Sequence, residues 1–373
     1  GSSVPLYNRA MRGGWRERLA VVLLAAGSLG LRLGFAPWTD FSQDEREIYA
    51  AARDFTRTGV LPVTGSSVSQ SGTRLPGSLL PLLVGVPIGL AGGSPLGAAR
   101  AAAAWNFAAV VLLYRLYRGL FPGLPAAALA AFLFYAPWTI VYTSIWNPSW
   151  LPVFSALFFT GLVRLFRRPD DRAGAFLLGF APVMALQLHL SFVLLPALAG
   201  TLLALRALRV PRPVPLLAGA AAGAVTLVPY LLAPPPAANA AGGFLLPNVV
   251  LHPRHLLELP AILVRFLSFA TGETFRVYAN DEVAVLAALI RSHAWLALPG
   301  LAALAGSLWL YWQGARFYAD GRRWGLLRTV RSGSLLERLD VLALITPLVA
   351  TLLFLFSLRR PAAQALWILM PLS

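Results

Sequence analysis

The stretch WTDFSQDEREIYAAARDFTRTGVLP, residues 38–62, gathers acidic residues in a chain that is otherwise mostly apolar. Five of the 15 acidic residues of the chain fall within it. Ser42, followed three residues later by Glu45, has the spacing of a capping box. We therefore expect an amphipathic helix that begins just after Ser42.

Asp44 takes an unusual position on this expected helix. A projection at 100° per residue places it within about 40° of the apolar residues Ile48, Ala51 and Phe55, while three arginines lie near the opposite side. A helix lying flat on a membrane would turn the arginines toward water and Asp44 inward. A carboxylate in that place is costly and is usually functional. The alternative is structural, because the helix dipole also favours an acid in the first turn.

The composition excludes a soluble globular protein. Of 373 residues, 58% are hydrophobic and 12% are charged, and the mean hydropathy is +0.68. These values predict an all-α polytopic membrane protein. The net charge of +16 comes from arginines that cluster between apolar runs, as the positive-inside rule produces, so no nucleic-acid partner is expected. The absence of cysteine excludes disulfides and thiolate metal sites.

The arginine distribution also predicts the topology. Arginines precede the first apolar run, residues 19–36, so the amino terminus should be cytoplasmic and the acidic stretch external. The next run, residues 76–92, contains Pro76, Pro81 and Pro87 and would make a poor spanning helix. If it did span, the later basic loops would lie outside. We therefore expect a second juxtamembrane helix there, which leaves most arginines cytoplasmic.

Four parts of the chain follow from this topology. Segment 1–18 is cytoplasmic, and 19–232 is a transmembrane module that includes an external juxtamembrane segment, 37–95. Segment 233–282 is an external loop, and 283–373 is a carboxyl-terminal transmembrane part. The last apolar run reaches only about half a span, so we expect further helices beyond it. The other expected spans are 98–116, 124–143, 150–166, 174–188, 192–208, 214–232, 283–312 and 341–356.

Several polar residues come to the external side in this arrangement. Each has a structural explanation when taken alone: Asn147 before a proline can begin a helix, His189 can be a hydrogen-bonded interior histidine, and paired arginines can anchor a helix end. Together they suit a reaction on a lipid-linked phosphate, because arginine pairs with phosphate and a partly desolvated carboxylate accepts a proton. The set comprises Asp44, Glu45, Arg74, Asn147, Gln187, His189, Arg359 and Arg360.

Five segments resemble a known family. They are DEREIYAAARDFTRTGVLP from Asp44, TRLPGSLLPLL around Arg74, LLYRLYRGLFPG, IWNPSWLPVFSALFF around Asn147, and QLHLSFVLLP from Gln187. This pattern resembles the GT-C superfamily of integral-membrane glycosyltransferases. The similar branch contains protein O-mannosyltransferases and the lipid A aminoarabinose transferase. The resemblance implies a GT-C-type transmembrane bundle with two juxtamembrane helices after the first span.

The resemblance also implies roles. Asp44 would be the catalytic base and Glu45 its acidic neighbour, which helps position the acceptor. The donor would be a polyprenyl-monophosphate sugar, and the acceptor a hydroxyl of a glycan, lipid or protein, outside a bacterial plasma membrane. The family pattern implies no metal cofactor, but Asn147 stands where relatives often carry an acid, which leaves a divalent metal open. Arg74, Arg359 and Arg360 would bind donor phosphate; Tyr49, Asn147, Gln187 and His189 would line the substrate pocket.

Two other functions fit the composition. A transporter or flippase of a lipid-linked saccharide is one, although such proteins often have inverted repeats and charges near the membrane midplane. The sequence has no visible inverted repeat. A noncatalytic assembly subunit would keep the fold without the chemistry. Release of free polyprenyl phosphate distinguishes an enzyme from both.

Overall fold

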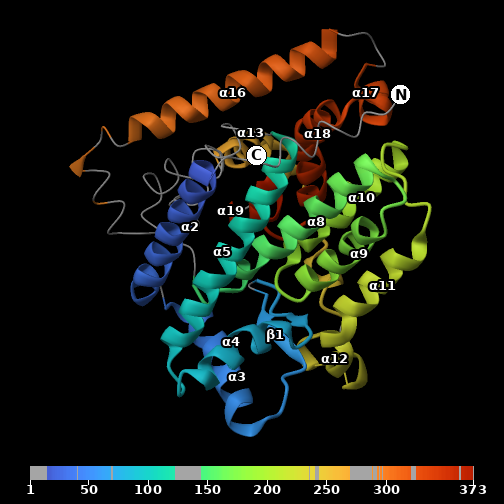
Figure 1. The fold of residues 1–373 in the computed structure, drawn as a ribbon. Helices are drawn as coiled ribbons and strands as arrows, with labels where there is room; N and C mark the ends of the chain where they lie inside the picture. Colours follow the sequence, from blue (N-terminus) through green and yellow to red (C-terminus); the bar gives the residue numbers. More distant parts are fainter. Residues whose placement is uncertain are drawn as a thin grey trace.

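A computed structural model of the chain describes residues 15–39, 41–68, 70–121, 144–234, 236–239, 243–268, 297–320, 325–360 and 363–372, and a few single positions between 288 and 295. The predicted span 124–143 and Asp40 lie outside these residues. The described part is mostly helical and contains one two-stranded sheet (Figure 1). The prediction of a mainly α-helical fold is therefore confirmed.

The helices follow the predicted order along the chain. The first half contains α2 (Trp15–Phe35), α3 (Gln43–Thr58), β1 (Thr64–Ser67), β2 (Arg74–Pro76), α4 (Leu79–Leu90), α5 (Pro95–Leu120), α8 (Leu151–Arg167) and α9 (Arg172–Leu186). The second half contains α10 (Leu194–Ala204), α11 (Pro213–Ala224), α12 (Val228–Leu232), α13 (Leu259–Ser268), α16 (Ala297–Asp320), α17 (Gly325–Ser332), α18 (Leu335–Leu355) and α19 (Ala363–Leu366). Short 3-10 turns join several of them: η1 (Ala36–Trp38), η2 (Asn147–Trp150), η3 (Leu190–Val193), η4 (Val225–Leu227), η5 (Ala237–Asn239), η6 (Leu246–Asn248), η7 (Pro253–Glu258) and η10 (Trp367–Leu372).

Five of the described helical segments are long and apolar enough to cross a membrane. They are Trp15–Trp38, Pro95–Leu120, Asn147–Arg167, Pro213–Leu232 and Leu335–Leu355. Helices α9 and α10 have only 15 and 11 residues. At 1.5 Å per residue, α9 is about 22 Å long and α10 about 16 Å long, less than the ~30 Å hydrocarbon core of a bilayer. Helix α9 is as long as the expected span 174–188, whereas α10 is shorter than the expected span 192–208.

Helices α2 and α5 run antiparallel. Glu17, in the first turn of α2, pairs with Arg118, in the last turn of α5, at 3.8 Å. Both the start of α2 and the end of α5 therefore lie at one end of the bundle. The segment between them turns at the other end, where α3, α4 and β1 gather (Figure 1). Helix α4 has 12 residues, about 18 Å, which agrees with the expectation that it does not span.

The structure differs from the sequence prediction in two local features. A small antiparallel sheet, β1 with β2, lies between α3 and α4, where only helix and turn were expected. The expected external loop 233–282 contains the turns η5, η6 and η7 and the helix α13. Its residues 269–282 lie outside the described part. Neither the TGSS nor the RLP segment alternates in polarity, so neither carries a strand pattern.

Glycines bring α9 and α11 into backbone contact. A Cβ atom added to Gly219 would lie 2.0 Å from the carbonyl oxygen of Phe176, and one added to Gly179 would lie 2.1 Å from that of Leu216. Only glycine allows such an approach, which is typical of packing between apolar helices. This contact fixes α9, and with it the loop that carries Gln187 and His189.

The end of the bundle that contains the α9 amino terminus is held by arginines. Arg164 binds the Asp171 carboxylate through two hydrogen bonds of 3.0 Å. Arg338 donates to the backbone carbonyls of Phe166, Val330 and Ala207. These contacts satisfy carbonyl groups near helix carboxyl termini, where cations are favourable. The acidic stretch lies at the opposite end.

Candidate functional site

Helix α3 begins as the sequence predicts. The Glu45 Oε2 atom accepts a hydrogen bond of 3.0 Å from the Ser42 backbone N–H, and the capping box is complete. Glu45 is only 4% exposed. Its Oε1 atom accepts a 3.3 Å hydrogen bond from the hydroxyl of Ser144, which lies 99 residues further along the chain. Glu45 therefore ties the first turn of α3 to the segment before α8.

The structure corrects the predicted orientation of Asp44. Its side chain is exposed, whereas the buried residues of α3 are Glu45, Ile48 and Ala52. The buried stripe follows the spacing i, i+3, i+7, and Asp44 lies at its edge, one residue away. Burial of Glu45 shifts the stripe, because its carboxylate is satisfied by local and distant hydroxyls. The expectation that Asp44 lies within the apolar face was wrong.

Asp44 is nevertheless oriented by the protein. The indole N–H of Trp146 donates a 3.1 Å hydrogen bond to Oδ2 of Asp44. Among the described residues, Oδ1 accepts no hydrogen bond. Trp146 packs edge-on against Trp367, with ring centroids 5.9 Å apart. One carboxylate oxygen is therefore held in place and the other remains available to a ligand.

The turn that carries Trp146 is fixed by α5. The Asn106 side-chain amide donates to the carbonyl of Ser149 at 2.7 Å, and the Trp105 indole donates to the carbonyl of Trp150 at 3.0 Å. The Trp150 indole in turn donates to the carbonyl of Ile145 at 3.2 Å. Such bonds position Trp146 on rigid elements, as a catalytic arrangement requires.

Arg359 lies within electrostatic reach of both Asp44 and His189. Burial lowers the pKa of the half-buried Arg359 guanidinium, and the Asp44 carboxylate opposes this shift. Burial, together with the Arg359 charge, lowers the pKa of His189 from 6.5 to about 4. Three residues that are far apart in the sequence therefore come together at one end of the bundle.

His189 is neutral in this setting. Its Nδ1 atom accepts a 3.1 Å hydrogen bond from the backbone N–H of Ser191, which caps the turn η3. An Nδ1 atom that accepts from an N–H carries no proton, so the proton of the neutral ring is on Nε2. The contact and the lowered pKa agree that His189 offers a hydrogen bond rather than a positive charge.

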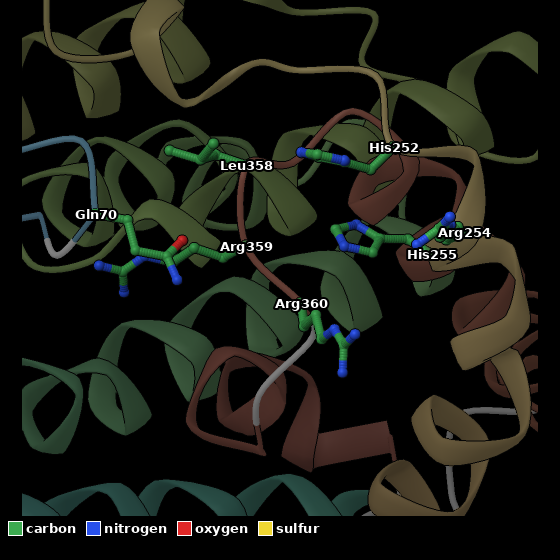
Figure 2. Close-up of a pocket in the computed structure, with 7 residues that line it drawn as sticks. All are labelled: Gln70, His252, Arg254, His255, Leu358, Arg359 and Arg360. Carbon is green, nitrogen blue, oxygen red and sulfur yellow. The ribbon is translucent and has the colours of Figure 1, made fainter.

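A pocket of about 580 Å³ adjoins Arg359. It is lined by Gln70, His252, Arg254, His255, Leu358, Arg359 and Arg360 (Figure 2). Arg359 and Arg360 were predicted from the sequence to bind phosphate. The histidines and Arg254 were not, because a His-X-X-His spacing in an expected loop is weak on its own. Arg254, which lies between the two histidines in the sequence, was the signal that could have identified these residues as an anion-binding group.

The other predicted residues have structural partners. Arg74 pairs with Glu47 at 2.6 Å, with both side chains 37% exposed. The Tyr49 hydroxyl donates to the carbonyl of Gly93 at 2.6 Å, at the turn between α4 and α5. The structure does not bring either of them to the pocket beside Arg359. Arg74 is therefore already neutralised, and Tyr49 joins two helices.

Asn147 and Gln187, which the sequence predicted to line a substrate pocket, are buried. The Asn147 amide donates to the carbonyl of Leu188 at 2.6 Å. The Gln187 amide donates to the carbonyl of Gly223 at 3.1 Å, and the residue is 0% exposed. Both side chains fasten the turn that carries His189. Their polarity serves backbone carbonyls, a common use of buried amides.

The arrangement offers a carboxylate, a neutral imidazole and guanidinium groups around one area. A carboxylate can accept a proton from a hydroxyl, and guanidinium groups stabilise an anion that develops on phosphate. Within the described residues, no group of three or more His, Asp or Glu side chains is arranged to hold a metal ion. The carboxylate, imidazole and guanidinium groups can together bind an anion and accept a proton beside it.

Helices long and apolar enough for a bilayer, with this polar site at one end, define a helical membrane protein as the class. Comparison of the chain with protein-family models, with curated proteins and with solved structures found no match.

Proposed function

We propose that the chain is an inverting glycosyltransferase of GT-C type. It would move one sugar from a polyprenyl monophosphate to a hydroxyl of an acceptor at the external face of a bacterial plasma membrane. The observation that carries this proposal is the hydrogen bond from Trp146 that fixes Oδ2 of Asp44 and leaves Oδ1 open, together with the interaction of the Asp44 charge with Arg359. A base beside a phosphate-binding cation is the minimum that such a transfer needs.

The reaction divides between these residues. The acceptor hydroxyl gives its proton to Oδ1 of Asp44 while its oxygen bonds to the anomeric carbon. The bond from that carbon to the phosphate oxygen breaks, and its electron pair leaves with the polyprenyl phosphate. Arg359 and Arg360 stabilise the charge that grows on this phosphate. A single displacement inverts the anomeric carbon.

Trp146 and His189 support this geometry. Trp146 fixes Oδ2 of Asp44, which leaves the direction of Oδ1 defined. The proton on Nε2 of neutral His189 can donate to a sugar hydroxyl or a phosphate oxygen without adding charge beside Arg359. Glu45 holds α3 against the Ser144 segment, so its part is positioning rather than acid–base chemistry.

Donor consumption by purified protein tests the proposal. The protein would be incubated with polyprenyl-monophosphate sugars and an extract of envelope glycans and lipids, and released polyprenyl phosphate would be measured by mass spectrometry. We expect Asp44→Asn to lower release by 10²- to 10⁴-fold, the range for loss of a general base. Asp54→Asn, an exposed acid on the same helix, is the matched control and should behave as wild type.

Two results would contradict the proposal. Asp44→Asn protein that releases polyprenyl phosphate at a near-normal rate would remove Asp44 from the chemistry. Donor that crosses to the other leaflet of a vesicle without losing its sugar would identify a flippase instead.

A further inference from the structure

The pocket beside Arg359 has more cationic character than a donor phosphate needs. The described residues that line it include three arginines and two histidines, and none of these described residues carries a carboxylate. Its volume of about 580 Å³ lies in the range of small-molecule sites, which is about 300–1,000 Å³. Arginine and histidine are the side chains that bind phosphate and carboxylate groups. The lining therefore indicates an anionic ligand with room for more than one group.

The walls of this pocket are firmly connected. The backbone N–H of His252 donates to the carbonyl of Leu355 at 2.7 Å, and the N–H of Leu358 donates to the carbonyl of Asn248 at 2.9 Å. A further bond of 3.0 Å joins Val250 to Phe356. These bonds hold the segment before η7 against the segment after α18. The histidines and the arginines therefore keep their relative positions without a ligand.

His255 is aimed by its own hydrogen bond. It is 7% exposed, and its Nδ1 atom lies 2.8 Å from the carbonyl oxygen of Phe354. A carbonyl only accepts, so Nδ1 carries the proton and donates it. Nε2 is then the ring nitrogen that can meet a ligand. The His252 ring lies beside it, with centroids 5.0 Å apart, and both rings point toward the Leu358–Arg359 segment (Figure 2).

The three arginines of the pocket point in different directions. Figure 2 shows that Arg359 extends toward Gln70 and that Arg360 points away from Gln70. Arg254 lies on the side of the histidines. Arg359 is also the pocket residue whose charge reaches Asp44 and His189. The catalytic region therefore lies on the Arg359 side of the pocket. The side formed by His252, Arg254 and His255 is left for a different group.

The charges give the same division. A sugar–phosphate–polyprenyl diester carries one negative charge, and Asp44 carries a second. Arg359 and Arg360 balance these two charges, which leaves Arg254 and the two histidines without an anion from the donor. Because the side chains that remain can donate to phosphate or carboxylate, they match an acidic group on the other substrate.

We propose that His252, Arg254 and His255 form a separate subsite that binds an anionic group, phosphate or carboxylate, of the sugar acceptor. This inference rests on the proposed function, and it names the acceptor class as acidic rather than neutral. The acceptor hydroxyl that reacts at Asp44 would lie on the same molecule as this anionic group. The subsite would thus select the acceptor and direct it toward the base.

Binding of two simple probes tests the subsite. Decyl phosphate, a short-chain lipid phosphate, would first saturate the donor position of the full chain in detergent. Inorganic phosphate would then be titrated by calorimetry, and glucuronate in a parallel arm would show whether phosphate or carboxylate is preferred. We expect one of them to bind wild-type protein, and we expect the double variant His255→Asn, Arg254→Gln to weaken this binding at least 10-fold. Decyl phosphate affinity should change less than 2-fold.

The variants separate recognition from folding. The amide of His255→Asn can replace Nδ1 as donor to the Phe354 carbonyl, so the wall of the pocket is retained while Nε2 is lost. Arg57→Gln, an exposed arginine on α3, controls for loss of general positive charge and should leave both probes unaffected. With the variant's thermal midpoint within about 2 °C of wild type, a loss of decyl phosphate affinity would contradict a separate subsite.

Other outcomes overturn the inference. If saturating decyl phosphate abolished phosphate and glucuronate binding to wild-type protein, the pocket would be a single site. If the double variant bound as tightly as wild type, these residues would not be the subsite. Failure of decyl phosphate to bind at all would instead contradict the proposed donor, and the same variant comparison with phosphate alone would then decide the pocket.

Discussion

Replacement of Glu45 by alanine should destabilise the protein, whereas replacement of its neighbour Asp44 should not. Glu45 is 4% exposed, and its two oxygens accept hydrogen bonds from Ser42 and Ser144. Glu45→Ala removes the capping box and leaves the Ser144 hydroxyl without its acceptor. Asp44 is exposed and lies outside the buried stripe.

The magnitude follows from the lost bonds. A hydrogen bond to a charged group contributes roughly 1.5–3 kcal/mol, and loss of a helix cap costs about 1 kcal/mol. Relief of the desolvation of a buried carboxylate offsets part of this loss. The net destabilisation should be about 2–3 kcal/mol. With an unfolding entropy of roughly 2.1 cal/mol/K per residue over the chain, the thermal midpoint should fall by about 3–4 °C.

Thermal unfolding of detergent-solubilised variants at one fixed scan rate measures this difference, because membrane proteins often unfold irreversibly. Asp44→Ala should shift the midpoint by less than about 1 °C, because the hydrogen bond that Asp44 accepts from the Trp146 indole is exposed to solvent and contributes little. A Glu45→Ala protein that melts with the wild type, together with an Asp44→Ala protein that melts several degrees lower, would contradict this prediction. That outcome would mean that Asp44 is the buried acid.

Three further results are expected. Because the pKa of His189 is lowered in the folded protein, the unfolded chain binds a proton first as the pH falls, and the free energy of unfolding should drop between pH 6.5 and 4, by about 3 kcal/mol at pH 4. The variant His189→Asn, which keeps the acceptor of the η3 cap, should not lose this stability in acid. Identical acid-unfolding profiles for variant and wild type would refute this prediction. Gly219→Val should cost about 3 kcal/mol or more, because its side chain meets the Phe176 carbonyl; wild-type unfolding would contradict the α9–α11 contact. Arg74→Gln should slow donor consumption less than Arg359→Gln does, because Arg74 is already paired with Glu47, and the reverse order would favour Arg74 as the phosphate ligand.

Local patterns were readable from the sequence. The capping box of α3 depends on residues three apart, and its prediction at Ser42 and Glu45 is confirmed. The helix order was also predicted, because long apolar runs in a membrane protein have few other structures available. The expected non-spanning position of residues 76–92 agrees with the antiparallel α2 and α5. This prediction rested on the distribution of arginines between the apolar runs and on the prolines within residues 76–92.

Distant contacts were not readable. Glu45 is buried in place of Asp44 because it accepts a hydrogen bond from Ser144, and no periodicity within α3 could reveal this distant contact. The pairing of Arg74 with Glu47 likewise follows from the β1–β2 sheet, whose strands lack a polar–apolar alternation. The histidine pocket depends on backbone pairing between the segments before η7 and after α18. Backbone pairing of this kind cannot be predicted from the pattern of side chains in the sequence.

The central claim is that Asp44 and Arg359 act as one site. A double-mutant cycle on kcat/KM for donor consumption tests it most directly, with wild type, Asp44→Asn, Arg359→Gln and the double variant. Groups that act as a unit lose their effects non-additively. We predict that the double variant is about as slow as Asp44→Asn alone. Fully multiplicative losses, or near-normal turnover of Asp44→Asn, would contradict the account.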